Sequence, residues 1–236
     1  SGPLNIHNDH SDAMGMKDTG WVMLFSKNNQ DVYDNTIIGT MIAENSSVLL
    51  PIAICQDGFI TSHSIENIEI LEDDEVTKLV GKYNNNVNLL DKENPVTVGP
   101  LDLPTHLFEH KRLQVEALAN AKKVFKEISE KYEKISGRKI NMIDTYMVED
   151  ADTVIIAIGS TAETIEEVVD RRRKNGEKVG VIAIRMFRPF PSEEIISALN
   201  NVKNIAVMDK VMDYSLNGGP LYKEIISAIY DMREKE

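Results

Sequence analysis

The sequence predicts an α/β fold with parallel strands. From residue 152 onward, apolar runs of strand length alternate with segments of helical periodicity, which is typical of βαβ units with helices outside a parallel sheet. Upstream, residues 48–55 form an uninterrupted apolar run, the pattern of a strand that is covered on both faces. Between these regions, a helical pattern that starts at Pro104 and stops at Gly137 predicts one long helix.

The first region supplies few strands for a sheet. Residues 1–19 have no regular period and are expected to form a loop. The elements predicted after it are a strand at 20–25, a helix at 31–45, the strand at 48–55 and a short helix at 73–82. Because an independently stable sheet usually needs three or more strands, we expect this chain to be a fragment that is truncated at its N-terminus, and at its C-terminus as well.

The second region alternates regularly. Its predicted strands are residues 153–158, 178–184 and 204–208, and its predicted helices are residues 161–175, 192–201 and 220–232. The long helix that precedes it has a narrow apolar stripe, which predicts a strut between two domains. The stripe consists of Leu107, Val115, Leu118, Phe125, Ile128, Tyr132 and Ile135.

Composition narrows the class of protein. The 236 residues are 42% hydrophobic and 27% charged, which predicts folded globular structure. A formal net charge of −12 argues against binding to nucleic acid or to an anionic membrane. The single cysteine, Cys55, excludes a disulfide framework and an iron–sulfur cluster that this chain alone would hold. Without a signal-like start or an apolar run of bilayer length, we expect a cytoplasmic protein.

Polar side chains follow the apolar run at residues 48–55. Asp57, Thr61, Ser62 and His63 stand where its strand ends, and ligands of open α/β sheets bind beyond the carboxyl ends of strands. The simpler interpretation is a turn at Asp57 and Gly58, and local pattern alone favours it. Ser62 lacks the Gly-x-Ser-x-Gly elbow of serine hydrolases, so hydrolase chemistry is disfavoured.

A histidine-rich loop near the N-terminus is a second candidate. His7, His10 and Asp12 combine imidazole and carboxylate groups at short spacing, as metal ligands do. The sequence offers no obvious fourth ligand. We therefore expect these side chains to organise the loop through hydrogen bonds, and we predict no metal site.

Two further motifs have structural explanations. Gly159-Ser160-Thr161 opens a helix after a strand, where phosphate can bind, but Ser160 with Glu163 predicts a capping box instead. The segment Arg-Met-Phe-Arg-Pro-Phe-Pro at residues 185–191 ends a strand with two cations and two prolines. We expect it to terminate the strand and to dock one domain on the other through Arg188, Pro189 and Phe190.

Taken together and in order, several motifs resemble the α subunit of the pyruvate:ferredoxin oxidoreductases, also called pyruvate synthases. They are NIHNDHSD at residues 5–12 with DTGW at 18–21, DGFITSH at 57–63, GPLDLP at 99–104, FEHK at 108–111, RPFP at 188–191 and NGGP at 217–220. The resemblance runs nearly from end to end of the chain.

The resemblance implies a subunit of a thiamine-diphosphate enzyme of anaerobic metabolism. In that family a 2-oxoacid loses carbon dioxide, electrons pass through iron–sulfur clusters to ferredoxin, and the acyl group goes to coenzyme A; the reaction also runs in reverse. It implies a partial pyrimidine-binding domain at residues 1–103, a linking helix at 104–137 and a transketolase C-terminal-like, parallel three-layer domain at 138–236. Thiamine diphosphate, its Mg²⁺ and the clusters belong to the complete complex with partner subunits, and this chain alone is expected to hold none of them.

The resemblance also fixes which residues are expected near the chemistry. The family's catalytic residues are expected upstream of Ser1, so no residue here is assigned a catalytic role and the isolated chain is expected to be inactive. Lys17 stands where many relatives have arginine, which keeps the charge without the planar fork. Residues expected beside cofactor or substrate are His10, Asp12, Lys17, Asp57, Thr61, Ser62 and His63.

Three alternatives remain open at this stage. The substrate can be a branched-chain 2-oxoacid, since the residues that select it are not visible. The chain can also be a non-catalytic interaction module on the same fold. A histidine-carboxylate metal hydrolase that uses His7, His10 and Asp12 is the third, and we expect it to be wrong.

Overall fold

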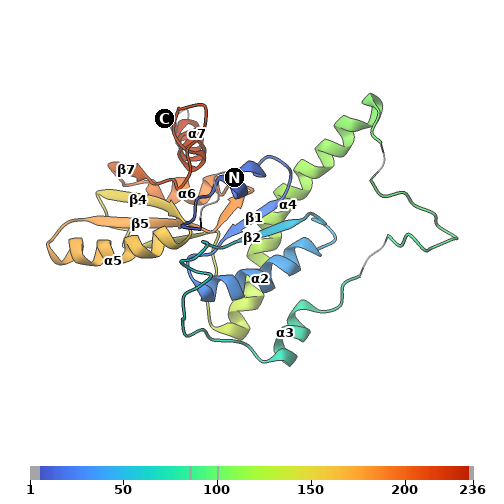
Figure 1. The fold of residues 1–236 in the computed structure, drawn as a ribbon, viewed down its shortest axis with the longest axis horizontal. Helices are drawn as coiled ribbons and strands as arrows, with labels where there is room; N and C mark the ends of the chain where they lie inside the picture. Colours follow the sequence, from blue (N-terminus) through green and yellow to red (C-terminus); the bar gives the residue numbers. More distant parts are fainter. Residues whose placement is uncertain (1–5, 85–86, 100, 234–236) are drawn as a thin grey trace.

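The computed structural model describes residues 6–84, 87–99 and 101–233, and within them the chain forms two sheets with helices packed around them (Figure 1). The predicted α/β class is confirmed. Asn5 and Pro100, which belong to the family motifs, lie outside the described residues.

The first sheet has the order β2-β1-β6. β1 (Val22–Phe25) pairs in parallel with β2 (Ile52–Cys55) and antiparallel with β6 (Met186–Arg188). Helix α2 (Asn29–Ala43) connects β1 to β2 and packs on this sheet. The third strand therefore comes from a segment more than 160 residues downstream of β1.

The central strand of this sheet is β1, and all four of its residues are buried. The prediction of a doubly covered strand at residues 48–55 is wrong in extent and in burial. β2 begins only at Ile52, lies at an edge of the described sheet and is half-buried. Leu49, with a φ of 47°, lies in the turn after α2. Val48 is also buried, but it lies in the hydrophobic core that contains side chains of α2 and α4.

The second sheet has the order β3-β5-β4-β7. β4 (Thr153–Ile158) pairs in parallel with β5 (Val179–Ile184) and with β7 (Asn204–Val207), as the alternating pattern predicts. β3 (Ile143–Tyr146), which the sequence did not predict, pairs antiparallel with β5.

Helices cover both faces of the second sheet. Along β4, Val154, Ile156 and Ile158 join the core formed with α6 (Ser192–Leu199) and α7 (Pro220–Arg233). The alternate residue Ala157 packs with α5 (Ser160–Lys174) on the other face. This period of two produces three layers.

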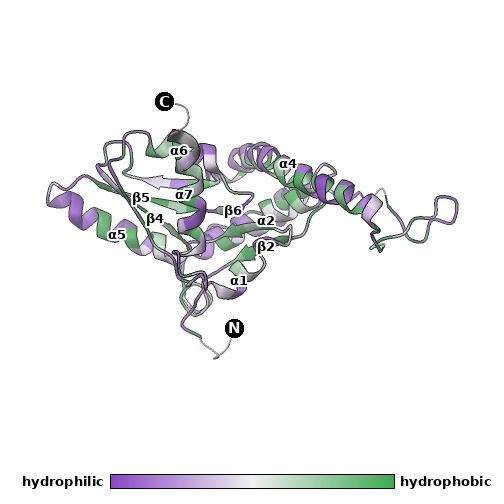
Figure 2. Ribbon diagram, turned by 90° about the horizontal axis from the view of Figure 1, so that it is seen from above, coloured by the Kyte–Doolittle hydropathy of each residue, from purple (hydrophilic) through white to green (hydrophobic). Residues whose placement is uncertain are grey.

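Helix α4 (Pro104–Ser136) changes character along its length. Its C-terminal half buries Phe125, Ile128 and Tyr132 against α2 and β1. Leu107, Val115 and Ile135 of the predicted stripe are exposed, so the stripe is shorter than the sequence predicts. The N-terminal half of α4 and the loop that precedes it project from the body (Figures 1 and 2).

Two short helices complete the fold. α1 (Ser11–Gly15) lies within the stretch that the sequence predicts as loop, and α3 (Asp73–Val80) follows β2. Both main cores combine the two regions of the chain. Phe25 of β1 packs into the core of the second sheet. Its ring meets the ring of Phe187 edge to face, with the centroids 6.0 Å apart.

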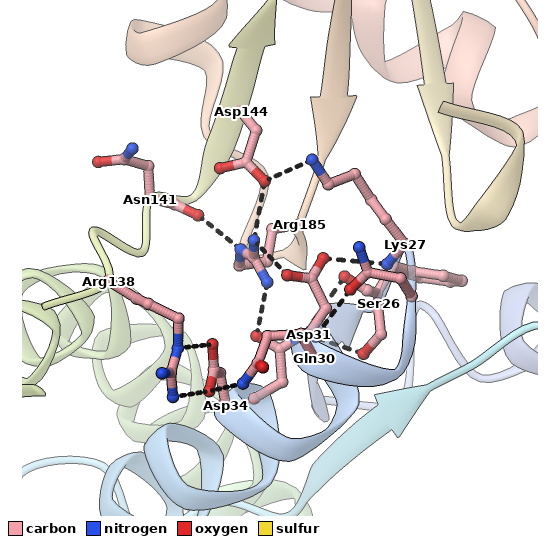
Figure 3. Close-up of polar contacts among 12 residues, drawn as sticks. Ser26, Lys27, Gln30, Asp31, Asp34, Arg138, Asn141, Asp144 and Arg185 are labelled. Carbon is pink, nitrogen blue, oxygen red and sulfur yellow. Dashed lines mark hydrogen bonds and ion pairs between the residues drawn. The ribbon is translucent and has the colours of Figure 1, made fainter. Parts of the chain in front are cut away.

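A buried arginine joins the two sheets (Figure 3). Arg185 follows β5 and is 4% exposed. Its Nη2 donates to Asp31 Oδ1 at 3.0 Å and to Asp144 Oδ2 at 2.8 Å, and its Nη1 donates to Asn35 Oδ1 at 3.0 Å. Its Nε donates to the carbonyl of Asn141. Burial alone would lower the pKa of Arg185, but the two carboxylates raise it, so the guanidinium stays charged.

Candidate functional site

A cavity of about 550 Å³ lies where the parallel strands β1 and β2 end. Phe25 and Cys55, the last residues of the two strands, line it together with Asp57. The polar lining residues include Asn8, His10, Gln56, Ser62 and His63. This is the position at which open α/β sheets bind ligands.

Asp57 is the polar centre of this region and is 2% exposed. Its Oδ1 lies 2.9 Å from His10 Nε2, and its Oδ2 accepts from Lys210 Nζ at 2.9 Å and from the backbone N–H of Ser160 at 3.0 Å. The Ser160 hydroxyl also donates to Oδ2. One carboxylate therefore ties together the N-terminal loop, the start of α5 and the segment after β7.

These partners keep Asp57 ionised. Burial alone would raise its pKa, but the hydrogen bonds from His10, Lys210 and Ser160 hold the pKa of Asp57 well below its ordinary value. Because an ionised carboxylate only accepts hydrogen bonds, His10 Nε2 carries the proton in this contact.

The predicted capping box at the start of α5 is wrong. The residue before the helix is Gly159, with a φ of 66°, and the Ser160 hydroxyl donates to Asp57 instead of accepting from the backbone. Glu163 accepts from Asn28 Nδ2 at 2.8 Å. A carboxylate from a distant segment thus occupies the helix N-terminus, where the helix dipole favours negative charge. A Cβ at position 159 would lie 2.8 Å from Asp57 Oδ1, so the close approach needs glycine.

The structure brings five of the seven predicted cofactor- or substrate-adjacent residues to the cavity. They are His10, Asp12, Asp57, Ser62 and His63. Ser62 Oγ lies 2.9 Å from His63 Nδ1, and the His63 ring stacks on Phe59 with centroids 4.7 Å apart. Phe59 has a φ of 69°, so its backbone is strained at the cavity wall.

The other two predicted residues, Thr61 and Lys17, are not among the lining residues of the cavity. Thr61 is 3% exposed, its N–H donates to the Asp57 carbonyl, and its Oγ1 has no partner within the described structure. Lys17 pairs with Asp18, and its carbonyl accepts from Arg188 Nε at 2.9 Å. Neither side chain lines the cavity.

Of the three residues predicted to dock the two regions, Arg188 has side-chain contacts with both of them. Arg188 Nη2 donates to Glu224 Oε1 of α7 at 2.6 Å and lies 3.5 Å from Asp18 Oδ1. The peptide bond to Pro189 is cis. Phe190 packs against the core of the second sheet, with its ring 5.8 Å from that of Phe187.

Sequence reasoning missed three residues of the site. Ser160 and Lys210 follow β4 and β7 at the carboxyl ends of their strands, so the rule that indicated Asp57 also applied to them. Asn8, with a φ of 71°, carries a buried Nδ2 that has no partner in the described part of the chain. No local pattern distinguished it from its polar neighbours.

Two other kinds of chemistry, attack by a cysteine thiol and metal binding, depend on Cys55 and on how the His, Asp and Glu side chains are grouped. Burial raises the pKa of the Cys55 thiol to about 12, so the thiol stays protonated and is a poor nucleophile. Among residues 6–84, 87–99 and 101–233, no three His, Cys, Asp or Glu side chains are grouped so that they could hold a metal ion.

These features define a class of protein: a two-sheet α/β protein with a ligand cavity at the carboxyl ends of parallel strands. Residues 1–130 match the family described as pyruvate flavodoxin/ferredoxin oxidoreductase, thiamine diphosphate-binding, and residues 151–236 match pyruvate:ferredoxin oxidoreductase core domain II. The chain belongs to the pyruvate:ferredoxin oxidoreductase family, which confirms the resemblance seen in its motifs.

Known proteins align along nearly the whole chain. Pyruvate synthase subunit PorA of Thermotoga maritima is 47% identical over 232 residues, which are 98% of this chain and 59% of that subunit. Ketoisovalerate oxidoreductase subunit VorA of Pyrococcus horikoshii is 35% identical over 97% of this chain and 58% of its own. The chain therefore spans less than two thirds of these relatives.

A solved structure shares the fold. The 2-oxoglutarate:ferredoxin oxidoreductase from Magnetococcus marinus, determined with 2-oxoglutarate, coenzyme A and succinyl-CoA bound, superposes with a TM-score of 0.60 at 16% identity. The match covers 92% of this chain and 40% of that one. In the described part of the present chain, no helix combines the length and apolar character needed to cross a bilayer.

Proposed function

We propose that this chain is part of the α subunit of a cytoplasmic pyruvate synthase. The complete enzyme would oxidatively decarboxylate pyruvate to acetyl-CoA with reduction of ferredoxin, and would catalyse the reverse synthesis. The observation that carries the proposal is the 47% identity to a pyruvate synthase subunit, against 35% to a ketoisovalerate oxidoreductase subunit of similar coverage. The second similarity keeps a branched-chain 2-oxoacid as the alternative substrate.

The cavity at β1 and β2 suits the pyrimidine side of thiamine diphosphate. The stacked rings of Phe59 and His63 offer a flat wall to a heteroaromatic ring. When bound, thiamine diphosphate supplies the carbon nucleophile and the electron sink for decarboxylation. We propose that Mg²⁺ and the iron–sulfur clusters are held by partner subunits.

The chain's own residues would shape this wall. His10, Lys210 and Ser160 hold Asp57 ionised and fix the loops on either side of the cavity. These contacts alone assign no catalytic role to any of them. Residues 1–103 would form the pyrimidine-binding part, 104–137 the link, and 138–236 the transketolase C-terminal-like part, with β6 of the last inserted into the first sheet.

A projecting arm supports the proposal of partner subunits. We use the name arm for the described residues between 81 and 115, which extend from the body in Figure 1. Its exposed apolar side chains are Tyr83, Val87, Leu89, Leu90, Val96, Val98, Leu101, Leu103, Leu107, Phe108, Leu113 and Val115. Large exposed apolar surfaces mark sites of protein association, so other subunits of the oxidoreductase would cover the arm.

We expect Phe108→Asp to weaken assembly with the partner subunits about thirtyfold, which corresponds to about 2 kcal/mol for one buried aromatic contact. Phe108 is 81% exposed in this chain, so the substitution should not change the thermal unfolding of the isolated chain. Size-exclusion chromatography of the mixed subunits measures the effect. Val168→Asp, at an exposed site on α5, is the matched control, and equal assembly of both variants would contradict the role of the arm.

Activity is tested by pyruvate-dependent reduction of a viologen dye. We expect turnover from the assembled complex and none from this chain alone, because this chain would supply only one wall of the thiamine site, while Mg²⁺ and the clusters would be held by partners. Turnover by the isolated chain would overturn the proposed division of labour. Faster turnover of 2-oxoisovalerate than of pyruvate by the complex would favour the branched-chain alternative. If the proteins that are purified together with this chain include no thiamine-enzyme subunit, the alternative of a non-catalytic interaction module would be favoured.

A further inference from the structure

One nitrogen of the His10 ring is not used in its hydrogen bond to Asp57. His10 Nε2 donates to Asp57 Oδ1 at 2.9 Å, but Nδ1 has no hydrogen-bond partner among the described residues. In the described structure, the polar side-chain atoms that are both fully enclosed and unpartnered do not include His10 Nδ1, so this nitrogen keeps accessible surface. Because the ring lines the cavity at β1 and β2, Nδ1 can meet a ligand there.

Three contacts besides Asp57 fix the position of His10. Its backbone N–H donates to the Lys210 carbonyl at 3.2 Å, and its carbonyl accepts from the N–H of Met14 at 2.9 Å. Its ring packs against that of Phe25, with the centroids 5.5 Å apart, and the side chain is 7% exposed. A side chain that is held in this way needs little reorganisation to meet a reacting group.

His10 and Asp57 have the arrangement of an imidazole base and the carboxylate that orients it. The buried, ionised carboxylate accepts the N–H of one ring nitrogen and leaves a lone pair on the other nitrogen. When that lone pair takes a proton, the imidazolium lies at hydrogen-bond distance from Asp57 and is stabilised by its negative charge. The geometry therefore suits the transfer of a proton from a ligand in the cavity.

Other ionisable groups near the ring compete less well for that proton. They are Asp9, Asp12, Cys55 and His63 in the cavity lining, and Lys210, which pairs with Asp57 Oδ2. Carboxylates are much weaker bases than imidazole. Burial raises the pKa of the Cys55 thiol to about 12, so the thiol already carries its proton. The His63 ring contacts Ser62, and no carboxylate orients it in the described part of the chain.

We propose that His10 accepts the proton that the reaction releases, an inference that rests on the proposed function. Oxidative decarboxylation of a 2-oxoacid with coenzyme A releases one proton overall, and the thiol is the acid that supplies it. The S–H bond breaks, sulfur forms the bond to the acyl carbon, carbon dioxide leaves and two electrons pass to ferredoxin. The proton goes to His10 Nδ1. In the reverse synthesis, the imidazolium returns the proton to the thiolate.

Kinetics of the assembled complex with His10→Gln test the proposal. Glutamine can still donate to Asp57, but it has no basic nitrogen. We expect kcat for pyruvate-dependent dye reduction to fall about 10²–10³-fold with little change in KM for pyruvate, as for the loss of a general base. Wild-type turnover should decrease in acid as solvent protonates Nδ1, and this decrease should be absent in His10→Gln. Glu177→Gln, at an exposed ion pair with Arg172, is the control and should behave as wild type.

Nuclear magnetic resonance of the full chain tests the geometry without any activity. The nitrogen chemical shifts of neutral His10 should show the proton on Nε2 and none on Nδ1. A proton on Nδ1 of the neutral ring would overturn the proposal, and so would a kcat and a pH profile in His10→Gln equal to those of wild type. A wild-type complex that does not turn over pyruvate would instead overturn the proposed function, together with the role of His10 that rests on it.

Discussion

Replacing Arg185 by leucine should lower the free energy of unfolding by about 3–5 kcal/mol, the usual cost of removing one partner from a buried ion pair. The leucine leaves the buried Asp31 carboxylate without its ion pair to the guanidinium, and it leaves Asn35 Oδ1 without its donor. Asp144, on β3, loses its link to α2 in the same step. Urea denaturation of the wild-type and variant chains at neutral pH measures the difference.

An exposed arginine provides the control for this prediction. Arg172→Leu removes a guanidinium that is 59% exposed and pairs with Glu177, so its effect should stay within about 0.5 kcal/mol. Adding Asp31→Asn to Arg185→Leu should recover part of the loss, since the uncompensated charge is then absent. A loss in Arg185→Leu no larger than that of the control would show that the two sheets do not depend on this network.

The elements predicted with fewest errors are those whose pattern is local. The strand at 153–158 was predicted at its observed bounds, and the alternation that follows it was recovered with small shifts at the ends. β3 and β6 were missed because each is only three or four residues long and pairs antiparallel with a strand far along the chain. Pairing of this kind depends on tertiary neighbours, which periodicity does not reveal.

Errors at the site have the same origin. The carboxyl-end rule placed Asp57, Ser62 and His63 at a cavity, but the identity of Asp57's partners required knowing which strand ends meet. Ser160 was assigned to cap its own helix because sequence shows only local acceptors and donors. In the folded chain, the carboxylate of Asp57, 103 residues away in sequence, accepts a hydrogen bond from the backbone N–H of Ser160 at the start of that helix.

Replacing Asp57 by asparagine should also cost about 3–5 kcal/mol at neutral pH, and here the loss should depend on pH. The pKa of Asp57 is held below its ordinary value of 3.8, so the stability that the carboxylate contributes is fully present above that value. It is lost as the pH falls through the lower pKa of the folded state. The difference between wild type and Asp57→Asn should therefore be constant from neutral pH to about pH 5 and shrink in stronger acid. Urea denaturation at a series of pH values measures it.

The same substitution separates a structural role of Asp57 from a role at the proposed thiamine site. Asp57→Asn leaves Lys210 without its carboxylate and loosens His10 and Ser160, which position the walls of the cavity. If those walls contact cofactor or substrate, turnover by the assembled complex should fall even at temperatures where the variant stays folded. Asp150→Asn, at an exposed ion pair with Arg173, should affect neither stability nor turnover appreciably. Normal turnover in a folded Asp57→Asn complex would mean that the carboxylate holds loops together without shaping the site. Asp57 would then have a structural role only, through its hydrogen bonds with His10, Lys210 and Ser160.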